Sequence, residues 1–161
     1  RCVSSASIRR RPPRAASTSV TPPSFTVVFR CADPRLNVFF TEPHLRVQMG
    51  LAENPRLESE SYVSNVGGLL TFVGAPGHRL AHDSALLLGL YGGGDDRVVL
   101  TAHSTCGGYL DALGADEESV RLRQVDDMRV TAEQLREALP GVKVDCYYLD
   151  TQGRTVALVS D

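Results

Sequence analysis

The chain has 161 residues, of which 42% are hydrophobic and 22% charged, and this size and composition indicate a single globular domain. Its net charge of −2 conceals an asymmetry, because residues 1–23 hold five of the 17 basic residues and no acidic residue. The rest of the chain carries 12 basic and 19 acidic residues, a net charge of −7, which argues against a nucleic-acid-binding surface. No apolar run approaches the ~18 residues that a membrane-spanning helix needs.

Residues 1–23 differ in composition from everything that follows. They are rich in Arg, Ser, Ala and Pro, contain no apolar core of a secretory signal, and end at Pro22-Pro23. This composition is typical of an organelle transit peptide, so we expect import into a chloroplast, or alternatively a mitochondrion. A disordered basic leader is the other interpretation. Because the chain begins with Arg, we expect the native start to lie upstream, and we assign the folded domain to residues 24–161.

Two short apolar runs in the first half of the domain predict strands, at residues 24–30 and 61–64. Between them, residues 36–51 are compatible with helix, and Pro43 is expected to start or interrupt it. The second strand runs into the sequence Asn65-Val66-Gly67-Gly68. Asn followed by paired glycines predicts a tight turn at which the backbone approaches another group closely.

The second half alternates between helical and strand patterns. Residues 79–91 have the apolar spacing of a helix, and residues 97–102 are continuously apolar, as in a central parallel strand. Residues 107–113 can form a short helix, whereas residues 114–130 are charged and give no clear pattern. The sequence Thr131-Ala132-Glu133-Gln134 matches a capping box and predicts that a helix begins there and extends to Leu139.

The end of the chain predicts an antiparallel hairpin. Residues 142–150 and 154–160 have strand character and are separated by a turn at residues 151–153. The order of elements is therefore β-α-β-α-β-α-β-β. This order predicts an α/β fold with a mostly parallel central sheet flanked by helices and an antiparallel edge strand. Ligands of such sheets bind beyond the carboxyl ends of the strands.

Chemically active residues follow two of the predicted strands. Cys31 follows the first, and His103 and Cys106 follow the third, which together offer the two thiolates and one imidazole of a catalytic zinc site with an open position. A buried structural cysteine with a hydrogen-bonded histidine is the simpler alternative. The flanking glycines and the neighbouring Asp33 and Arg35 favour the metal, because a carboxylate beside a guanidinium stays ionised and can orient a metal-bound water.

The motif C-x-D-x-R that begins at Cys31 precedes H-x-x-C-G-G, which begins at His103. This pair of motifs resembles the joint signature of the β-class carbonic anhydrases, and the resemblance covers roughly residues 25–113. It implies reversible hydration of CO2 to bicarbonate by zinc-bound hydroxide, one Zn²⁺ per chain, and a homodimer or higher homo-oligomer. It also implies three zinc ligands and a catalytic dyad, namely Cys31, His103 and Cys106, and Asp33 with Arg35.

The sequence departs from this family at one position near the expected pocket. The family commonly has Arg-Asn before the small-residue turn, whereas Ser64-Asn65 stands here. We expect Asn65, Gly67, Gly68 and Gly107 to line the substrate pocket. Two alternative functions remain: a hydrolase of carbonyl sulfide or carbon disulfide, which would use the same site, and a catalytically silent zinc-binding regulatory protein. The absent basic residue favours the silent protein, and the intact dyad argues against it.

Several other residues could contribute to the site or to the core. His44, His78 and His82 are candidates for a proton shuttle, because imidazole titrates near neutral pH. Cys146 lies in a predicted strand and is expected to pack in the core. The Phe39-Phe40 pair is expected in the core or at a subunit interface.

Overall fold

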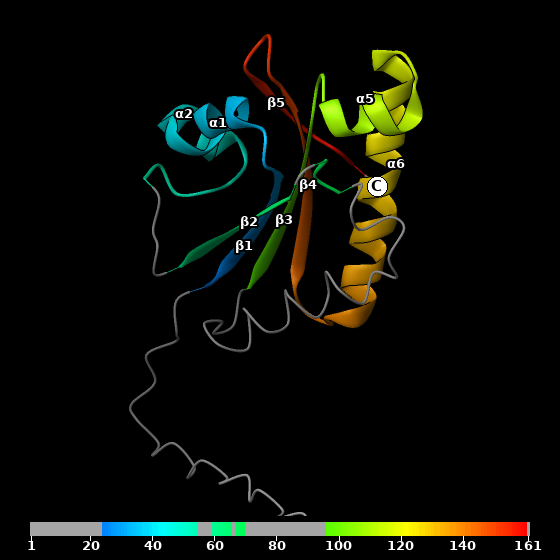
Figure 1. Ribbon diagram of the computed structural model, residues 1–161. Coiled ribbons are helices and arrows are strands. Elements are labelled where there is room, and N and C mark those ends of the chain that lie inside the picture. The colour runs from blue at the N-terminus through cyan, green and yellow to red at the C-terminus, as the bar shows by residue number, and fades with distance from the viewer. Residues whose placement is uncertain (1–23, 55–58, 66, 70–95, 161) are drawn as a thin grey trace, which may run out of the picture.

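The computed structural model describes residues 24–54, 59–65, 67–69 and 96–160 (Figure 1). The predicted leader at 1–23 and the predicted helix at 79–91 lie outside these residues, and so do His78 and His82. In the part of the chain that is described, no helix is both long enough and apolar enough to cross a membrane.

A five-stranded sheet forms the centre of the fold, with the strand order β2-β1-β3-β4-β5. The first four strands pair in parallel, and β5 pairs antiparallel with β4 at one edge. The predicted fold class is therefore confirmed. The strands span the following residues: β1 Thr26–Cys31, β2 Glu60–Asn65, β3 Arg97–His103, β4 Lys143–Asp150 and β5 Thr155–Leu158.

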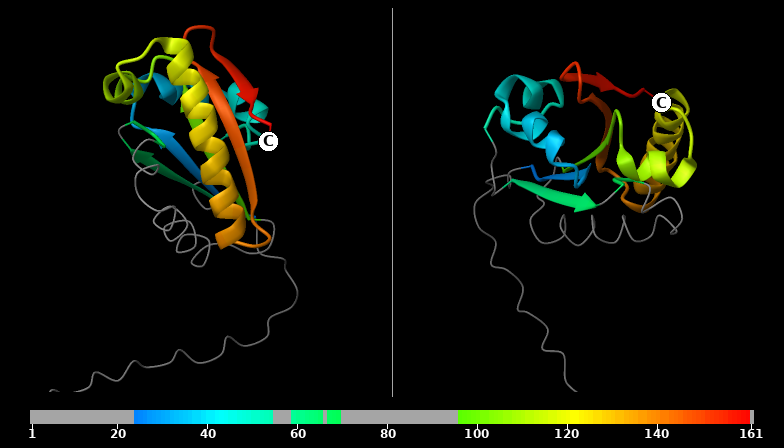
Figure 2. Two further views of the ribbon diagram at one scale, coloured as in Figure 1. Left: turned by 90° about the vertical axis from the view of Figure 1, so that its right-hand side faces the viewer. Right: turned by 45° about the horizontal axis from the view of Figure 1, so that its top comes forward.

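Alternating side chains of the strands supply two hydrophobic cores, one on each face of the sheet. Val27 and Phe29 of β1 pack in one core together with Met128 of a long helix, α6 (Glu117–Ala138). Val28, between them, faces the other core, which includes Phe39 and Phe40. Figure 2 shows α6 lying along one face of the sheet. The predicted core positions of Phe39-Phe40 and of Cys146, which lies in the core beside α6, are confirmed.

The first helical region follows β1 directly and is divided as Pro43 predicts. A 3-10 turn, η1 (Pro34–Leu36), leads into α1 (Asn37–Thr41), and α2 (Pro43–Gln48) begins at the proline. Glu42, between the two helices, has extended backbone angles, as is usual for a residue that precedes proline. The interruption therefore folds two short helices onto each other at the upper end of the sheet (Figure 1).

The second helical region differs from its prediction. A short helix, α5 (Gly107–Leu113), is followed by α6, which runs without a break over Glu117–Ala138. The predicted helix start at Thr131 is wrong, because Asp116 caps α6 by accepting a hydrogen bond from the Ser119 N–H at 3.0 Å. The Thr131 hydroxyl lies inside the helix, where it donates to the Asp127 carbonyl at 2.6 Å. The capping motif was thus a local pattern within a longer helix.

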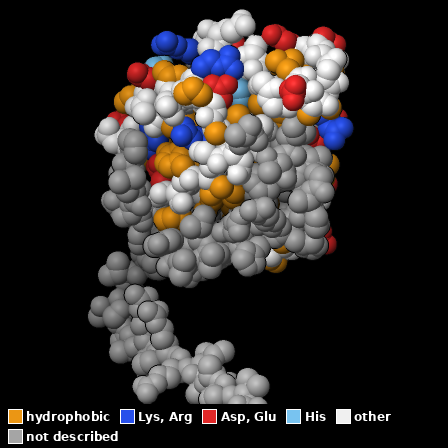
Figure 3. All heavy atoms as spheres, in the orientation of Figure 1, with side chains coloured by type: hydrophobic (Ala, Val, Ile, Leu, Met, Phe, Trp, Pro, Cys, Tyr) orange, Lys and Arg blue, Asp and Glu red, His pale blue; other side chains and the backbone are white. Residues whose placement is uncertain are grey.

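The carboxyl ends of the parallel strands lie at the top of Figure 1, next to α1, α2 and α5. In Figure 3, acidic and basic side chains are interspersed over the upper part of the described surface on this side. The strand order places the neighbours of β1 so that β2 lies on one side and β3 on the other. The chain thus reverses its direction of sheet growth at β1 and β3, and ligand sites of open α/β sheets form at such positions.

Candidate metal centre

Three potential metal ligands meet beyond the ends of β1 and β3. Cys31 is the last residue of β1, His103 is the last residue of β3, and Cys106 caps α5. One ligand atom from each, the two sulfurs and a ring nitrogen, lie within 4.8 Å of one another, and all three side chains are buried. The structure therefore brings together the three residues that the sequence places at strand ends, and the group could hold a metal ion.

The orientation of His103 fits a metal ligand. Its Nδ1 lies 2.9 Å from the Ser104 carbonyl oxygen, so this nitrogen carries the proton and donates to the carbonyl. The opposite nitrogen, Nε2, is buried and has no hydrogen-bond partner among the described residues. A buried lone pair without a partner is costly, and coordination of a metal ion would satisfy it. Two cysteines and one histidine in this state are a donor set that Zn²⁺ prefers.

The two cysteines interact strongly with each other. The hydrogen bond from the Cys106 thiol lowers the pKa of Cys31 to about 4, and the nearby His103 contributes in the same direction. The same hydrogen bond, together with burial, raises the pKa of Cys106. The pair thus favours one thiolate and one thiol that share a single proton, an arrangement which a divalent cation can replace.

Asp33 and Arg35 form a close pair beside these ligands. The Arg35 Nε and a terminal nitrogen reach the two carboxylate oxygens of Asp33, the shortest contact being 2.6 Å. Asp33 also caps η1, since its Oδ1 accepts from the Arg35 backbone N–H at 2.9 Å. The hydrogen bonds from Arg35 lower the pKa of Asp33, so this carboxylate is ionised at neutral pH and held in a fixed direction.

Thr105 joins the two motifs and was not predicted from the sequence. Arg35 donates to the Thr105 hydroxyl at 2.8 Å and to its carbonyl oxygen at 3.0 Å. The backbone of Thr105 has φ of 54°, an uncommon value for a β-branched residue. No sequence signal marks such a residue, because the contact depends on the turn that carries His103 and Cys106.

A hollow of about 300 Å³ opens beside Cys31 and Asp33. Gly67, Gly107 and Gly108 also line it, so two of the predicted pocket residues, Gly67 and Gly107, lie at its wall. A Cβ atom on Gly108 would lie 2.7 Å from the Gly67 Cα, which only glycine avoids. The absence of a side chain at Gly108 therefore permits the close backbone approach that the sequence predicts for the turn at Gly67-Gly68.

Asn65 and Gly68 are near the site but do not line this hollow. The Asn65 carbonyl accepts hydrogen bonds from the N–H groups of Ala32 and Gly68, which ties β2 to the end of β1. A Cβ on Gly68 would lie 3.6 Å from the Cys31 Cβ. Both residues therefore support the position of Cys31.

The sequence also offers His44 as a shuttle candidate and has Ser64 where a basic residue is common. His44, a shuttle candidate, is exposed on α2 and does not line the hollow. Ser64 is exposed and accepts a hydrogen bond from the Arg30 Nε at 3.0 Å. Arg30 also lies over the ring of Phe40, with 5.1 Å from its guanidinium carbon to the ring centroid.

Comparison with known proteins identifies the fold through structure. No protein-family model matches the sequence, and no curated protein matches it either. The structure is similar to a carbonic anhydrase from Glaciozyma antarctica, with a TM-score of 0.54 and 15% identity over 88% of this chain and 85% of that one. It is also similar to tetrameric β-carbonic anhydrases from Sordaria macrospora, with a TM-score of 0.55 and 14% identity over 87% and 82%.

A β-carbonic anhydrase of Aspergillus fumigatus gives a TM-score of 0.56 at 8% identity, covering 88% of this chain and 92% of that one. These similarities extend over most of both chains, although few residues are identical. The protein therefore has the fold of the β-carbonic anhydrases, with a Cys-His-Cys group beyond the carboxyl ends of β1 and β3.

Proposed function

We propose that the protein is a zinc-dependent carbonic anhydrase of the β class, which catalyses the reversible hydration of CO2 to bicarbonate. One observation carries the proposal: an ionised, oriented carboxylate, Asp33, lines the same hollow as Cys31, one of three clustered metal ligands. A purely structural zinc site normally has four protein ligands and needs no such carboxylate. The β-carbonic anhydrase fold supports the same assignment.

The residues of the chain would act as follows. Cys31, His103 and Cys106 would hold Zn²⁺, which supplies a water nucleophile at neutral pH by lowering the pKa of water to about 7. Asp33 would accept a hydrogen bond from the attacking water and orient it toward CO2 in the hollow. Arg35 would hold the Asp33 carboxylate in place, because its guanidinium engages both carboxylate oxygens. Without this restraint, Asp33 could itself occupy the open position.

A stopped-flow assay of CO2 hydration, with the zinc content measured on the same full-chain sample, tests the proposal. We expect one zinc per chain and rapid hydration, and we expect both to be lost in Cys106→Ala. Cys146→Ala is the matched control, because Cys146 is buried in the other core, where its thiol contacts the Met128 carbonyl at 3.9 Å. One zinc per chain without hydration from neutral to alkaline pH would refute the assignment, and carbonyl sulfide would then be the next substrate to test.

The quaternary structure and the destination of the protein are also proposals. We propose a homodimer or higher homo-oligomer, which sedimentation velocity of the zinc-loaded protein would measure; a monomer at micromolar concentration would contradict it. The similar enzymes from Sordaria macrospora are tetrameric. We further propose that residues 1–23 direct import into a chloroplast, or alternatively a mitochondrion, and a fusion of these residues to a fluorescent protein tests this.

A further inference from the structure

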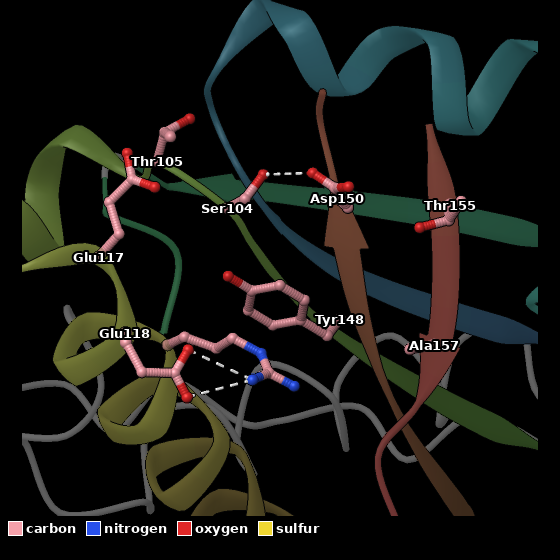
Figure 4. Close-up of a pocket in the computed structure, with 9 residues that line it drawn as sticks. Ser104, Thr105, Glu117, Glu118, Tyr148, Asp150, Thr155 and Ala157 are labelled. Atoms are coloured by element: carbon pink, nitrogen blue, oxygen red, sulfur yellow. Dashed lines mark hydrogen bonds and ion pairs between the residues drawn. The ribbon is translucent and has the colours of Figure 1, made fainter. Parts of the chain in front are cut away.

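The carbonyl that orients His103 belongs to Ser104, whose side chain and backbone N–H make further hydrogen bonds. Ser104 supplies the carbonyl oxygen that lies 2.9 Å from the His103 Nδ1. Its hydroxyl lies 3.1 Å from Asp150 Oδ1 and 2.9 Å from the Thr151 hydroxyl, and it accepts from the Thr151 N–H at 2.9 Å. Figure 4 shows the side chains of Ser104 and Asp150 pointing toward each other. The backbone N–H of Ser104 also donates to the Leu149 carbonyl.

The number of protons on these groups determines which group donates and which accepts in each hydrogen bond. Backbone hydrogen bonds from Gln152 and Gly153 lower the pKa of Asp150, so its carboxylate is ionised and can only accept. The single hydroxyl proton of Ser104 therefore points to Asp150, and the Thr151 hydroxyl donates to Ser104. The Ser104 side chain is thus held by three groups, which belong to Asp150 at the end of β4 and to Thr151, the next residue.

Asp150 is itself fixed by the turn between β4 and β5. Its two carboxylate oxygens accept hydrogen bonds from the N–H groups of Gln152 and Gly153, each at 3.0 Å. A Cβ on Gly153 would lie 2.6 Å from Asp150 Oδ2, so a side chain at this position would displace the carboxylate from its present place. The turn therefore presents Asp150 to Ser104 in one orientation.

We propose that Asp150 is a positioning residue of the metal centre: through Ser104, it fixes the carbonyl that directs the Nε2 of His103 toward Cys31 and Cys106. The proposal rests on the proposed function for the presence of the metal. It gives the hairpin of β4 and β5 a role at a site whose ligands come from β1, β3 and the N-cap of α5.

A second restraint acts on the same loop from the other side. Arg35 holds the hydroxyl and the carbonyl of Thr105, the next residue along the chain. The two residues after His103 are thus held by different elements, Ser104 by the hairpin and Thr105 by Arg35 of η1. Groups that orient a metal-ligating histidine typically change metal affinity about 10- to 100-fold when they are removed.

Metal affinity of the full chain, measured by competition with a chromophoric zinc chelator, tests the proposal without relying on turnover. We expect Asp150→Ala and Ser104→Ala each to weaken zinc binding about 10- to 100-fold. We also expect both to alter the visible absorption spectrum of the Co²⁺-substituted protein. Ser104→Thr keeps the hydroxyl and should remain close to wild type. The double variant should be little weaker than either single variant, because both changes break one chain of contacts.

Two controls separate positioning from other effects. Glu118→Gln removes a carboxylate that lines the same hollow of about 500 Å³ as Ser104 and Asp150 but pairs with Arg121 (Figure 4). Val156→Ala weakens the packing of β5 without touching Ser104. Both should bind zinc as wild type does.

Three results would overturn the proposal. The first is wild-type affinity and an unchanged Co²⁺ spectrum in Asp150→Ala and Ser104→Ala. The second is an equal loss of affinity in Val156→Ala, which would show that the hairpin acts only through general stability. The third is a wild-type chain that binds no zinc, which would refute the metal site as well. Wild-type protein that binds zinc but does not hydrate CO2 would refute the proposed function alone.

Discussion

Arg35 contacts residues that follow β1 and residues that follow β3, so it contributes both to the proposed function and to the local structure. Its guanidinium engages the carboxylate of Asp33 and the backbone of Thr105, although half of its side chain is exposed. We expect Arg35→Gln to retain zinc and to lower CO2 hydration about 10- to 100-fold, as is usual when a group that orients a reacting residue is lost. Stopped-flow assay at matched zinc content measures this, and an unchanged rate would contradict the role of the pair.

We also expect the effect of Arg35→Gln on the free energy of unfolding to depend on pH. Arg35 lowers the pKa of Asp33 in the folded protein, so the pair stabilises the fold above the unfolded pKa of about 3.9. This contribution is lost as the pH falls through the lower folded value. The difference in free energy of unfolding between wild type and Arg35→Gln should therefore shrink as the pH falls below about 4. Urea unfolding at several pH values measures it, and a difference that grows with acidity would contradict it.

Two adjacent glycines offer a matched comparison of backbone space at the site. A Cβ on Gly108 would lie 2.7 Å from the Gly67 Cα, whereas a Cβ on Gly107 would meet nothing within 4 Å in the structure described. We expect Gly108→Ala to reduce the free energy of unfolding by about 1–3 kcal/mol, the usual cost of overpacking. Gly107→Ala should change it much less. Equal effects in urea unfolding would show that the close approach is absent in solution.

The sequence predicted the candidate metal ligands more completely than the residues that support them. Cys31, His103 and Cys106 were found because each follows or lies near the end of an apolar run, and parallel strands end at one edge of a sheet. Asp150 and Thr105 could not be found in this way. The contact of Asp150 with Ser104 depends on the pairing of β3 with β4, and that of Thr105 with Arg35 depends on a backbone angle.

At the scale of elements, a buried ion pair fastens α2 to β2. Arg46 is fully buried, and it donates two hydrogen bonds to the Glu60 carboxylate at 2.8 and 2.7 Å and one to the Tyr62 hydroxyl. Its remaining donors reach the carbonyls of Phe40 and Ala52. β2 leads into the turn at Gly67, and α2 packs against α1, which follows Asp33 and Arg35. The ion pair between Arg46 and Glu60 therefore stabilises the segments on both sides of the hollow.

We expect Glu60→Ala to reduce the free energy of unfolding by about 3–5 kcal/mol, because it leaves the Arg46 charge buried without its partner. The exposed pair of Arg121 and Glu118, at 3.3 Å, provides the control. Glu118→Ala should cost less than about 1 kcal/mol. A small loss in Glu60→Ala by urea unfolding would mean that α2 detaches from β2 readily and that the buried network contributes little.

Elements with strong local patterns were predicted well, and α6 shows the limit of this approach. The apolar strands and the proline break after α1 are determined by local sequence. The buried residues of α6 are Val120, Gln124, Asp127, Met128, Thr131, Ala132 and Leu135. Three of these seven residues are polar or charged, and further charged residues lie between them, so the helical pattern is weak until the packing of the helix is known. The capping motif at Thr131 therefore predicted the wrong first residue for this helix.

At the scale of the whole molecule, the fold brings two distant loops to one point. β1 and β3 are neighbours in the sheet, although residues 32–96 separate them in the chain. Of the candidate metal ligands, Cys31 and His103 end β1 and β3, and Cys106 lies in the loop after β3, which Arg35 and Asp150 both restrain. The order of the strands could be expected only in part from the sequence, because periodicity shows which runs are strands and does not show which of them pair.

The proposed function requires a metal ion held by Cys31, His103 and Cys106 with one position left open. X-ray absorption spectroscopy of the zinc-loaded full chain tests this most directly, because it counts the ligand atoms and measures their distances. We predict two sulfur ligands at about 2.3 Å, one nitrogen at about 2.0–2.1 Å, and one further light atom. Cys31→Ser should remove one sulfur from this shell. A zinc ion bound by four protein sulfur or nitrogen ligands, or by no sulfur, would contradict this arrangement.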